Sequence, residues 1–191
     1  GEPVPGGLVR DDAAELRLAV SRALSRADLV VVSGGSSVGA KDMVAGVLNS
    51  LGEPGVLVHG LSLKPGKPTV IAVVGGRPVF GLPGHPVSAL IVFGLFVRPL
   101  ILRLSGLSGP GTPGRRVAAR LARNIPSAAG REDYVPVALR EEAGGLVARP
   151  VPGRSGLISM LVAADGVAVV PAGREGIVAG ETVEVELFRE G

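Results

Sequence analysis

The first third of the chain alternates amphipathic and continuously apolar segments. Between residues 12 and 27 apolar side chains recur every three or four positions, and Asp12 followed by Glu15 has the spacing of a helix-capping box. The run at 28–32, which is branched aliphatic after Asp28, is typical of a strand that is buried on both faces. A second helical period covers 43–51, and a glycine follows it as a stop signal. These segments predict helix, strand, glycine-rich loop and helix in succession.

The next segment combines short strands with one long apolar helix. Strands are predicted at 56–59, 69–74 and 78–81. A Gly-Gly pair joins the last two of them. Pro86 suits the first turn of a helix that continues to about Leu104, and Pro99 should kink or break that helix near Val97. Because helices alternate with strands, we expect an α/β domain with a mostly parallel sheet.

The pattern changes at residues 105–114, where glycine, proline and serine predominate as they do in linkers. Short alternating apolar runs follow, at 116–121, 134–140, 146–149, 166–170 and 183–187. Turn residues separate these runs, and one short helical turn is expected near 157–163. This is the pattern of a small all-β domain, either a sandwich or a barrel. We therefore predict an αβα sandwich over residues 1–107 and a β-barrel domain over 113–188.

Composition fits a protein with a sizeable core and excludes several kinds of site. Of the 191 residues, 46% are hydrophobic but only 3% are aromatic, so aliphatic side chains must build the core. The absence of cysteine excludes disulfides and thiolate metal sites and fits the cytoplasm, which we predict as the location. With His59 and His85 as the only histidines, a structural zinc site is not expected. The apolar run 87–97 is too short to span a bilayer, so we expect a buried helix, no membrane association and no secretory leader.

Positive charge is concentrated in the first half of the chain. The formal net charge is +3, and residues 1–108 hold ten Lys or Arg against seven Asp or Glu, whereas residues 109–191 hold ten of each. No basic run and no interleaved aromatic residues accompany this excess, so we expect no nucleic-acid partner. Only three residues are lysine, and two of these are Lys64 and Lys67. A small anionic ligand near the two lysines explains the bias.

Three stretches of the first domain carry candidate ligand-binding chemistry: Ser33–Gly39, Lys64–Pro68 and Gly81–Ser88. The first and third follow an apolar run and open a helical pattern, so their backbone N–H groups can point at one anion. The second supplies Lys64 and Lys67, and its prolines stiffen the loop. Because ligands of open parallel sheets collect at the carboxyl ends of the strands, we predict that the three stretches form one phosphate-binding pocket.

For several residues in and near these stretches, the local sequence is compatible with more than one role. Asp42 fits a helix N-cap as well as a carboxylate that holds a divalent cation beside a phosphate. Ser37 and Ser88 can bind an anion or simply satisfy backbone groups near a helix N-terminus. His85 is better placed to donate a hydrogen bond than to act as an acid or base, and His59 is interpreted as structural. Spacing alone supports an anion-binding α/β domain followed by a β domain.

Taken in order, the three stretches resemble motifs of the MoeA family, the molybdopterin molybdenumtransferases that include the gephyrin E-domain. The family's Gly-Gly-x-Ser-x-Gly-x-x-Asp element is matched by Gly-Gly-Ser-Ser-Val-Gly-Ala-Lys-Asp at 34–42. Its Lys-Pro-Gly-Lys-Pro loop is matched at 64–68, and its Gly-Leu-Pro-Gly-Asn-Pro-Val-Ser signature is similar to 81–88. Further similarity to the family's C-terminal β-barrel is found at 130–134, 153–156 and 171–185.

The resemblance implies the last step of molybdenum cofactor synthesis. In that step adenylylated molybdopterin is hydrolysed with release of AMP, and molybdate is inserted into its dithiolene with the assistance of Mg²⁺ or Zn²⁺. On this basis the candidate metal ligand is Asp42, and the candidate catalytic residues are Asp42, Lys64 and Lys67, the lysines holding molybdate or phosphate. The candidate residues for binding the pterin substrate are Gly34, Gly35, Ser37, Gly39, Pro65, Gly66, Pro83, Gly84, His85, Pro86 and Ser88. The family also implies a homodimer for the full-length protein.

The chain departs from the family pattern in two places. Position 85 is His where the family usually has Asn, which changes the hydrogen bonding at the rim of the pocket. Family members also carry two further domains and a Thr-x-Gly-Asp-Glu element upstream, so we expect these 191 residues to bind the adenylate without hydrolysing it. Two alternative functions are a non-catalytic molybdopterin-binding or scaffold module and a MogA-like molybdopterin adenylyltransferase. The appended β domain argues against the second.

Overall fold

The computed structural model describes residues 1–34, 38–107, 115–153, 156 and 158–188, and for residues 38–42 it describes the backbone only. The chain divides into two compact units. The first consists of Gly1–Leu61 with Gly66–Ser108, and the second of Ser62–Pro65 with Gly109–Gly191. The short segment Ser62–Pro65 therefore belongs with the second half of the chain, which the sequence pattern did not predict.

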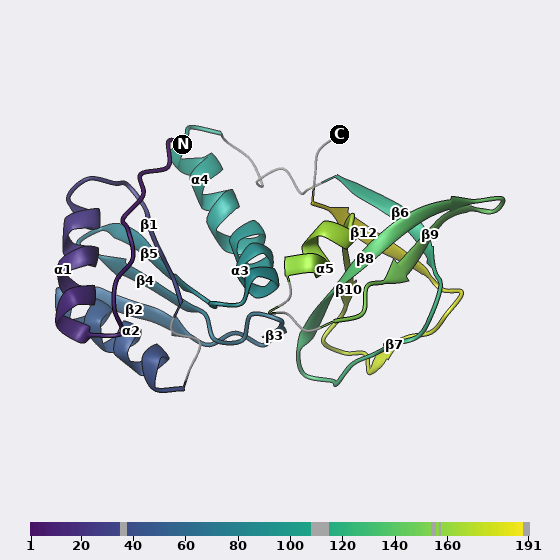
Figure 1. Cartoon of the computed structure of the whole chain (residues 1–191), viewed down its shortest axis with the longest axis horizontal. Helices are drawn as coiled ribbons and strands as arrows, with labels where there is room; N and C mark the ends of the chain where they lie inside the picture. The colour runs from purple at the N-terminus through teal and green to yellow at the C-terminus, as the bar shows by residue number, and fades with distance from the viewer. Residues whose placement is uncertain (35–37, 108–114, 154–155, 157, 189–191) are drawn as a thin grey trace. The chain divides into compact units, whose positions relative to one another are not determined.

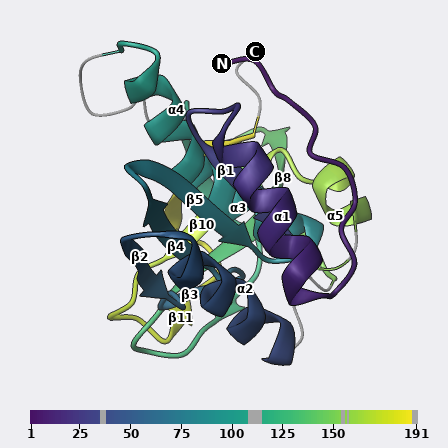
Figure 2. The same ribbon diagram turned by 90° about the vertical axis from the view of Figure 1, so that its left-hand side faces the viewer.

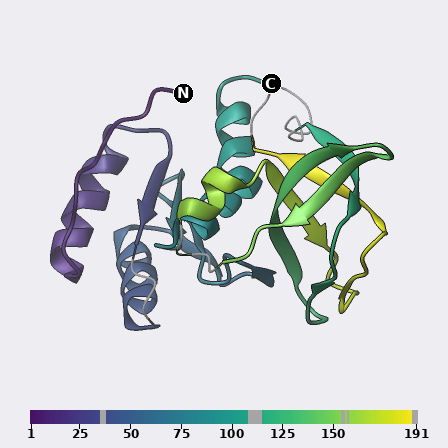
Figure 3. The same cartoon turned by 45° about the vertical axis from the view of Figure 1, so that its right-hand side comes forward.

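The first unit has three layers, with a four-stranded sheet between two sets of helices (Figure 1). One face of the sheet is covered by α1 (Ala13–Leu24) and α2 (Val38–Leu51), and the other by α3 (Pro86–Val92) and its continuation (Figure 3). The strands, in spatial order, are β1 (Val30–Ser33), β5 (Arg77–Leu82), β4 (Val70–Val74) and β2 (Pro54–His59). Figure 2 shows α1 and α2 side by side in front of these strands. The predicted αβα sandwich is confirmed.

The sheet is mixed, so the expectation of a mostly parallel sheet is wrong. β1 runs parallel to β5, but β4 is antiparallel to both of its neighbours, β5 and β2. The turn at Gly75-Gly76 is the reason for the first antiparallel pair, because two consecutive residues with positive φ (55° and 79°) close a tight hairpin. The apolar runs at β4 and β5 reflect burial between two helical layers, which does not depend on strand direction.

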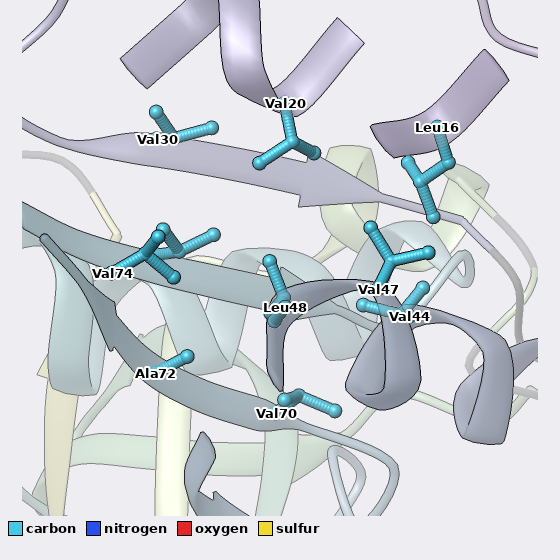
Figure 4. Close-up of a cluster of buried hydrophobic side chains, with 10 residues drawn as sticks. Leu16, Val20, Val30, Val44, Val47, Leu48, Val70, Ala72 and Val74 are labelled. Carbon is cyan, nitrogen blue, oxygen red and sulfur yellow. The ribbon is translucent and has the colours of Figure 1, made fainter. Parts of the chain in front are cut away.

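The core of the first unit lies between the α1–α2 layer and the sheet (Figure 4). Leu48 of α2 is completely buried there, together with Ala72 of β4. Leu16 and Val20 of α1 point into the same cluster, one helical turn apart, as the apolar period predicts. No aromatic side chain belongs to the described cluster, so branched aliphatic residues build it.

The helix starts agree with the sequence at α1 and differ at α2. Asp12 caps α1, because its Oδ1 accepts hydrogen bonds from the N–H groups of Ala14 (2.9 Å) and Glu15 (2.8 Å). α2 begins at Val38, so Asp42 lies inside the helix and is not its N-cap. Apolar periodicity places the start of α2 too late, because glycine, alanine and lysine at 39–41 add no large apolar side chain to the period.

The apolar stretch after Pro86 is helical as far as Leu104, with an irregular centre. A π-helical turn, η1 (Phe93–Val97), separates α3 from α4 (Arg98–Leu104). Pro99 follows this turn, and proline cannot donate the backbone hydrogen bond that a regular α-helix requires. The interruption of the α-helix near Val97 is therefore confirmed.

Only part of this long helix is buried. Val87, Ile91 and Val92 are covered, but Leu90 is 40% exposed and Leu104 is 53% exposed. By length and composition the stretch could cross a membrane, and it is the one such helix in the described part of the chain, with 28% of its most apolar window buried. A core helix of a soluble protein passes the same test, so this finding is weak support for a membrane span. The helix after Pro86 is therefore buried on one face only, and the expectation of a buried helix is correct for that face.

The second unit is a small barrel. Its main strands are β6 (Arg116–Leu121), β8 (Glu132–Glu142), β9 (Gly145–Pro150), β10 (Gly166–Val170) and β12 (Thr182–Leu187). They pair in the closed cycle β8–β10–β12–β6–β9–β8, so these strands form a barrel, as predicted. Its interior holds Leu121, Val137 and Val185, all completely buried.

Four smaller elements complete the second unit. The expected short helix is α5 (Ile158–Ala163). Two-residue strands β7 (Ile125–Pro126) and β11 (Gly176–Ile177) pair with each other, and β3 (Leu63–Lys64) pairs in parallel with the start of β8. None of these two-residue strands was predicted, because segments so short leave no periodicity in the sequence.

Candidate functional site at one edge of the first sheet

The predicted glycine stretches leave the first sheet at the same edge. β1 ends at Ser33 directly opposite Leu82, the last residue of β5, and the Gly34 N–H donates to the Leu82 carbonyl with an N···O distance of 3.3 Å. The start of β4 lies at this edge as well, because Val70 pairs with Gly81. Residues that follow β1, follow β5 and precede β4 are therefore neighbours in space. The carboxyl ends of a parallel strand pair are the usual location of ligands in such sheets.

The stretch before β4 is fixed by hydrogen bonds around Thr69. The fully buried Thr69 hydroxyl donates to the Gly66 carbonyl at 2.6 Å, and the Thr69 carbonyl accepts from the Gly60 N–H at 2.8 Å. The Leu61 N–H donates to the Lys67 carbonyl at 2.9 Å. Gly66 has a φ of 126°, a conformation that favours glycine. The backbone of Lys67 is thus held in place while the residue itself is exposed.

We expect Thr69→Val to destabilise the first unit by about 1–3 kcal/mol, because valine keeps the shape of threonine but leaves the buried Gly66 carbonyl without its donor. Chemical denaturation measures the loss. Ser105→Ala is the matched control, since this exposed hydroxyl also donates to a backbone carbonyl, that of Ile101, at 2.9 Å. The control should change stability by less than about 0.5 kcal/mol. Equal effects of the two substitutions would contradict the role given to Thr69.

The stretch after β5 turns into α3 through two prolines. A Cβ on Gly81 would lie 3.2 Å from the side chains of both Val44 and Val70, so glycine lets β5 pass close to α2 and β4. Pro83 is buried, and Pro86 occupies the first turn of α3, where a missing N–H costs nothing. His85 is the N-cap residue with extended backbone, and its carbonyl accepts from the Ala89 N–H at 2.9 Å.

A hollow of about 250 Å³ adjoins this edge. It runs along α1 and β1 beside residues 6–11 and reaches the edge at Ser33 and Gly34, whereas the described residues of 64–68 and 81–88 do not line it. Gly84 and His85 are exposed, whereas Ser88 is 3% exposed and packs inside the protein. Backbone N–H groups and exposed side chains at this edge can bind an anion without burying an uncompensated charge.

Some predicted site residues lie outside the described structure. This applies to Gly35 and Ser37. For Gly39 and Asp42 the structure describes the backbone only. It is helical and belongs to the start of α2. Their roles, like those of the other candidate residues, stay predictions.

The two lysines of the Lys-Pro-Gly-Lys-Pro loop belong to different compact units. Lys67 belongs to the first unit, whereas Lys64 and Pro65 belong to the second. Lys64 lies in β3, and its Nζ atom is 3.5 Å from Oδ2 of Asp133 in β8. Sequence reasoning treated the two lysines as equivalent, and the structure gives them different neighbours.

The described residues hold no group of three Asp, Glu or His side chains that could bind a metal ion. Mg²⁺ commonly takes one or two carboxylates and completes its shell with water and phosphate oxygens, so Asp42 beside a bound phosphate is a suitable donor set. Zn²⁺ prefers several nitrogen or sulfur ligands, and the chain has no cysteine and two histidines. The donor types therefore fit Mg²⁺ better than Zn²⁺.

Sequence reasoning missed Thr69 and Asp133. Asp133 is 2% exposed and lies on the same side of β8 as Val135 and Val137, which face the barrel core. A charged residue in register with core positions is a signal that could have identified it. Thr69 gave no comparable signal, because a threonine at the start of a strand is common.

Two family models match the chain. Residues 2–103 match the probable molybdopterin binding domain, and residues 118–188 match the MoeA C-terminal region, domain IV. The chain belongs to the MoeA family. The MoeA match in the second half distinguishes it from proteins that have a molybdopterin-binding domain alone.

Individual MoeA relatives agree with this assignment. Molybdopterin molybdenumtransferase 1 of Mycobacterium tuberculosis is 39% identical over 193 residues, which cover 96% of this chain and 44% of the relative. The molybdopterin molybdenumtransferase of Haemophilus influenzae is 35% identical over 189 residues, 98% of this chain and 46% of the relative. The crystal structure of a MoeA molybdopterin biosynthesis protein from Pyrococcus horikoshii superposes with a TM-score of 0.84 at 39% identity, over 100% of this chain and 45% of that one. The chain spans less than half the length of these MoeA relatives.

Proposed function

We propose that this MoeA chain takes part in molybdenum cofactor biosynthesis by binding adenylylated molybdopterin, from which AMP is released as molybdate is inserted. The observation that carries the proposal is the convergence at one sheet edge of the ends of β1 and β5 and the start of β4. The stretches 33–39 and 81–88 leave the sheet at these points, and 66–68 lead into β4. Similar chains named molybdopterin molybdenumtransferase support the reaction class.

Each part of the edge has a separate proposed task. Backbone N–H groups after Gly34 and near Gly84 bind phosphate oxygens, and Lys67 supplies a positive charge beside them. Pro86 and His85 shape the rim against the pterin, and the buried Pro83 supports them. Asp42 would hold a Mg²⁺ ion, which when bound neutralises phosphate charge and activates water for hydrolysis. The chain's own contribution is to orient the phosphates against that carboxylate.

Ligand selectivity tests the proposal. Titration of the 191-residue chain with adenylylated molybdopterin, followed by pterin fluorescence, should give saturable binding. Neopterin, which has the bicyclic pterin without phosphate, and AMP, which has the phosphate without the pterin, should each bind at least tenfold more weakly, because each lacks part of the contact surface. The affinity for AMP is measured by displacement of the bound adenylate. Equal binding of AMP and the adenylate would contradict recognition of the pterin, and absence of saturable binding would overturn the proposal.

Removing the Asp42 carboxylate should abolish the effect of magnesium on binding. We expect Mg²⁺ to strengthen binding of the adenylate to the unmodified chain severalfold and to leave the affinity of Asp42→Asn unchanged, because the amide provides no charge for the ion. Asp28→Asn is the control, since Asp28 precedes β1 at the opposite end of that strand. Equal strengthening of all three proteins by Mg²⁺ would contradict the assignment of Asp42 as metal ligand.

A further inference from the structure

The second unit contains a buried carboxylate between two cations. The side chain of Asp133 is 3% exposed. The Arg131 Nε atom donates to its Oδ1 at 2.8 Å, and the Lys64 Nζ atom lies 3.5 Å from its Oδ2. The side chains of Lys64 and Arg131 are 60% and 39% exposed. One carboxylate therefore faces two cations that still reach solvent.

Stability alone does not explain the contact with Lys64. A buried carboxylate needs a partner, and the short hydrogen bond from Arg131 provides one. Lys64 is largely hydrated, so its ion pair with Asp133 resembles a surface pair and contributes little to folding. The pair does restrict the flexible lysine side chain, whose ammonium would otherwise sample many positions.

The backbone of Lys64 is fixed by the same strand. β3 pairs in parallel with β8, with Leu63 opposite Glu132 and Lys64 opposite Asp133. The Glu132 N–H also donates to the Ser62 carbonyl at 3.1 Å. Both the main chain and the ammonium of Lys64 are thus held at the first two residues of β8. The lysine has little remaining freedom between its Cα and the carboxylate.

We propose that Asp133 is a positioning residue that holds the Lys64 ammonium in the orientation used for the anionic substrate. This inference rests on the proposed function and on the sequence-based prediction that Lys64, like Lys67, holds phosphate or molybdate. Asp133 is too buried to contact the ligand itself, so it acts through Lys64. Its carboxylate engages Lys64 through one oxygen, and the exposed remainder of the ammonium stays open to a ligand.

A double-mutant cycle separates positioning from general stabilisation. We expect Lys64→Ala to weaken binding of adenylylated molybdopterin about tenfold and Asp133→Asn to weaken it by a similar factor. The double variant should be no weaker than Lys64→Ala, because Asp133 has no other route to the ligand. Additive losses, or normal binding by Asp133→Asn, would overturn the inference while the proposed function stands. Absence of binding by the unmodified chain would overturn both.

A second cluster of the same kind provides the control. Glu142, at the other end of β8, lies between Arg149 (2.8 Å) and Arg120 (3.6 Å), but its side chain is 38% exposed. Glu142→Gln removes a carboxylate from between two cations in the same strand. It should leave adenylate affinity unchanged, and a loss equal to that of Asp133→Asn would overturn a specific role for Asp133.

The side chain of Lys64 can also be observed directly, because the chain has only three lysines. In NMR spectra of lysine-labelled protein, the two Hε protons of Lys64 should be inequivalent in the unmodified chain. They should become equivalent in Asp133→Asn, while the Lys67 signal stays unchanged. Equivalent Hε protons for Lys64 in the unmodified chain would overturn the inference without requiring any variant to fold.

Discussion

Replacing Lys67 by alanine is expected to weaken binding of adenylylated molybdopterin about tenfold to a hundredfold, since a hydrogen bond to a charged group contributes roughly 1.5–3 kcal/mol. Lys67 is exposed. Its carbonyl accepts a hydrogen bond from the Leu61 N–H, and the Thr69 hydroxyl holds the neighbouring Gly66 carbonyl. The substitution therefore removes the ammonium without removing a contact that the fold needs. Fluorescence titration gives the affinity, and the thermal midpoint should be unchanged.

The control for this prediction is Arg26→Ala. Arg26 is an exposed cation that follows α1 and precedes β1, so it lies near the opposite end of that strand. Its loss should not change the affinity by more than twofold, because solvent and salt screen charges at that separation. If both substitutions weaken binding equally, the ligand is attracted by diffuse positive charge and there is no specific site at the sheet edge.

Replacing Leu48 by alanine should have the largest effect on stability, a loss of about 2–5 kcal/mol in the unfolding of the first unit. Leu48 is completely buried between α2 and the sheet, among Val20, Ala72 and the other aliphatic side chains of the core (Figure 4). The substitution leaves a cavity that these short, branched neighbours cannot fill. Urea denaturation followed by circular dichroism measures the change.

A matched leucine on the surface tests whether burial is the cause. Leu18 of α1 is 58% exposed, and Leu18→Ala should change the free energy of unfolding by less than about 0.5 kcal/mol. Because alanine has the higher helix propensity, the substitution introduces no penalty of its own. A loss below about 1 kcal/mol for Leu48→Ala would show that the cluster in Figure 4 does not form the core.

Elements whose residues are adjacent in the chain could be predicted closely from the sequence. The strands expected at 116–121 and 166–170 are observed with those bounds, because their alternation and their flanking turn residues are local signals. The cap at Asp12 was also predicted, since its acceptor and donors lie within three residues. The Gly75-Gly76 hairpin belongs to this group as well.

Features that depend on distant pairing could not be predicted. The direction of β2 follows from its pairing with β4, which no residue of β2 encodes by itself. The start of α2 at Val38 is likewise earlier than the apolar period of 43–51 indicates. In both cases local periodicity is compatible with more than one arrangement, and the three-dimensional context selects one.

The candidate site also has parts that the sequence predicts and parts that it does not. Glycine and proline identified the stretches that leave the sheet, because their backbone requirements are local. The neighbours of Lys64 were not predictable, since a two-residue strand at 63–64 pairs with residues 132–133 far along the chain. Asp133 could be recognised as unusual from its register in β8, but its partner could not.

Binding of a phosphorylated pterin at one edge of the first sheet can be measured from amide chemical shifts during titration with adenylylated molybdopterin. The backbone N–H signals of Gly34, Lys67 and Gly84, which lie at or next to that edge, should shift with one common dissociation constant. Those of Gly75 and Gly76, in the turn at the opposite edge, should not move. Shifts at Gly75 and Gly76 without shifts at Gly34 and Gly84 would place the ligand at the opposite edge and rule out the proposed site.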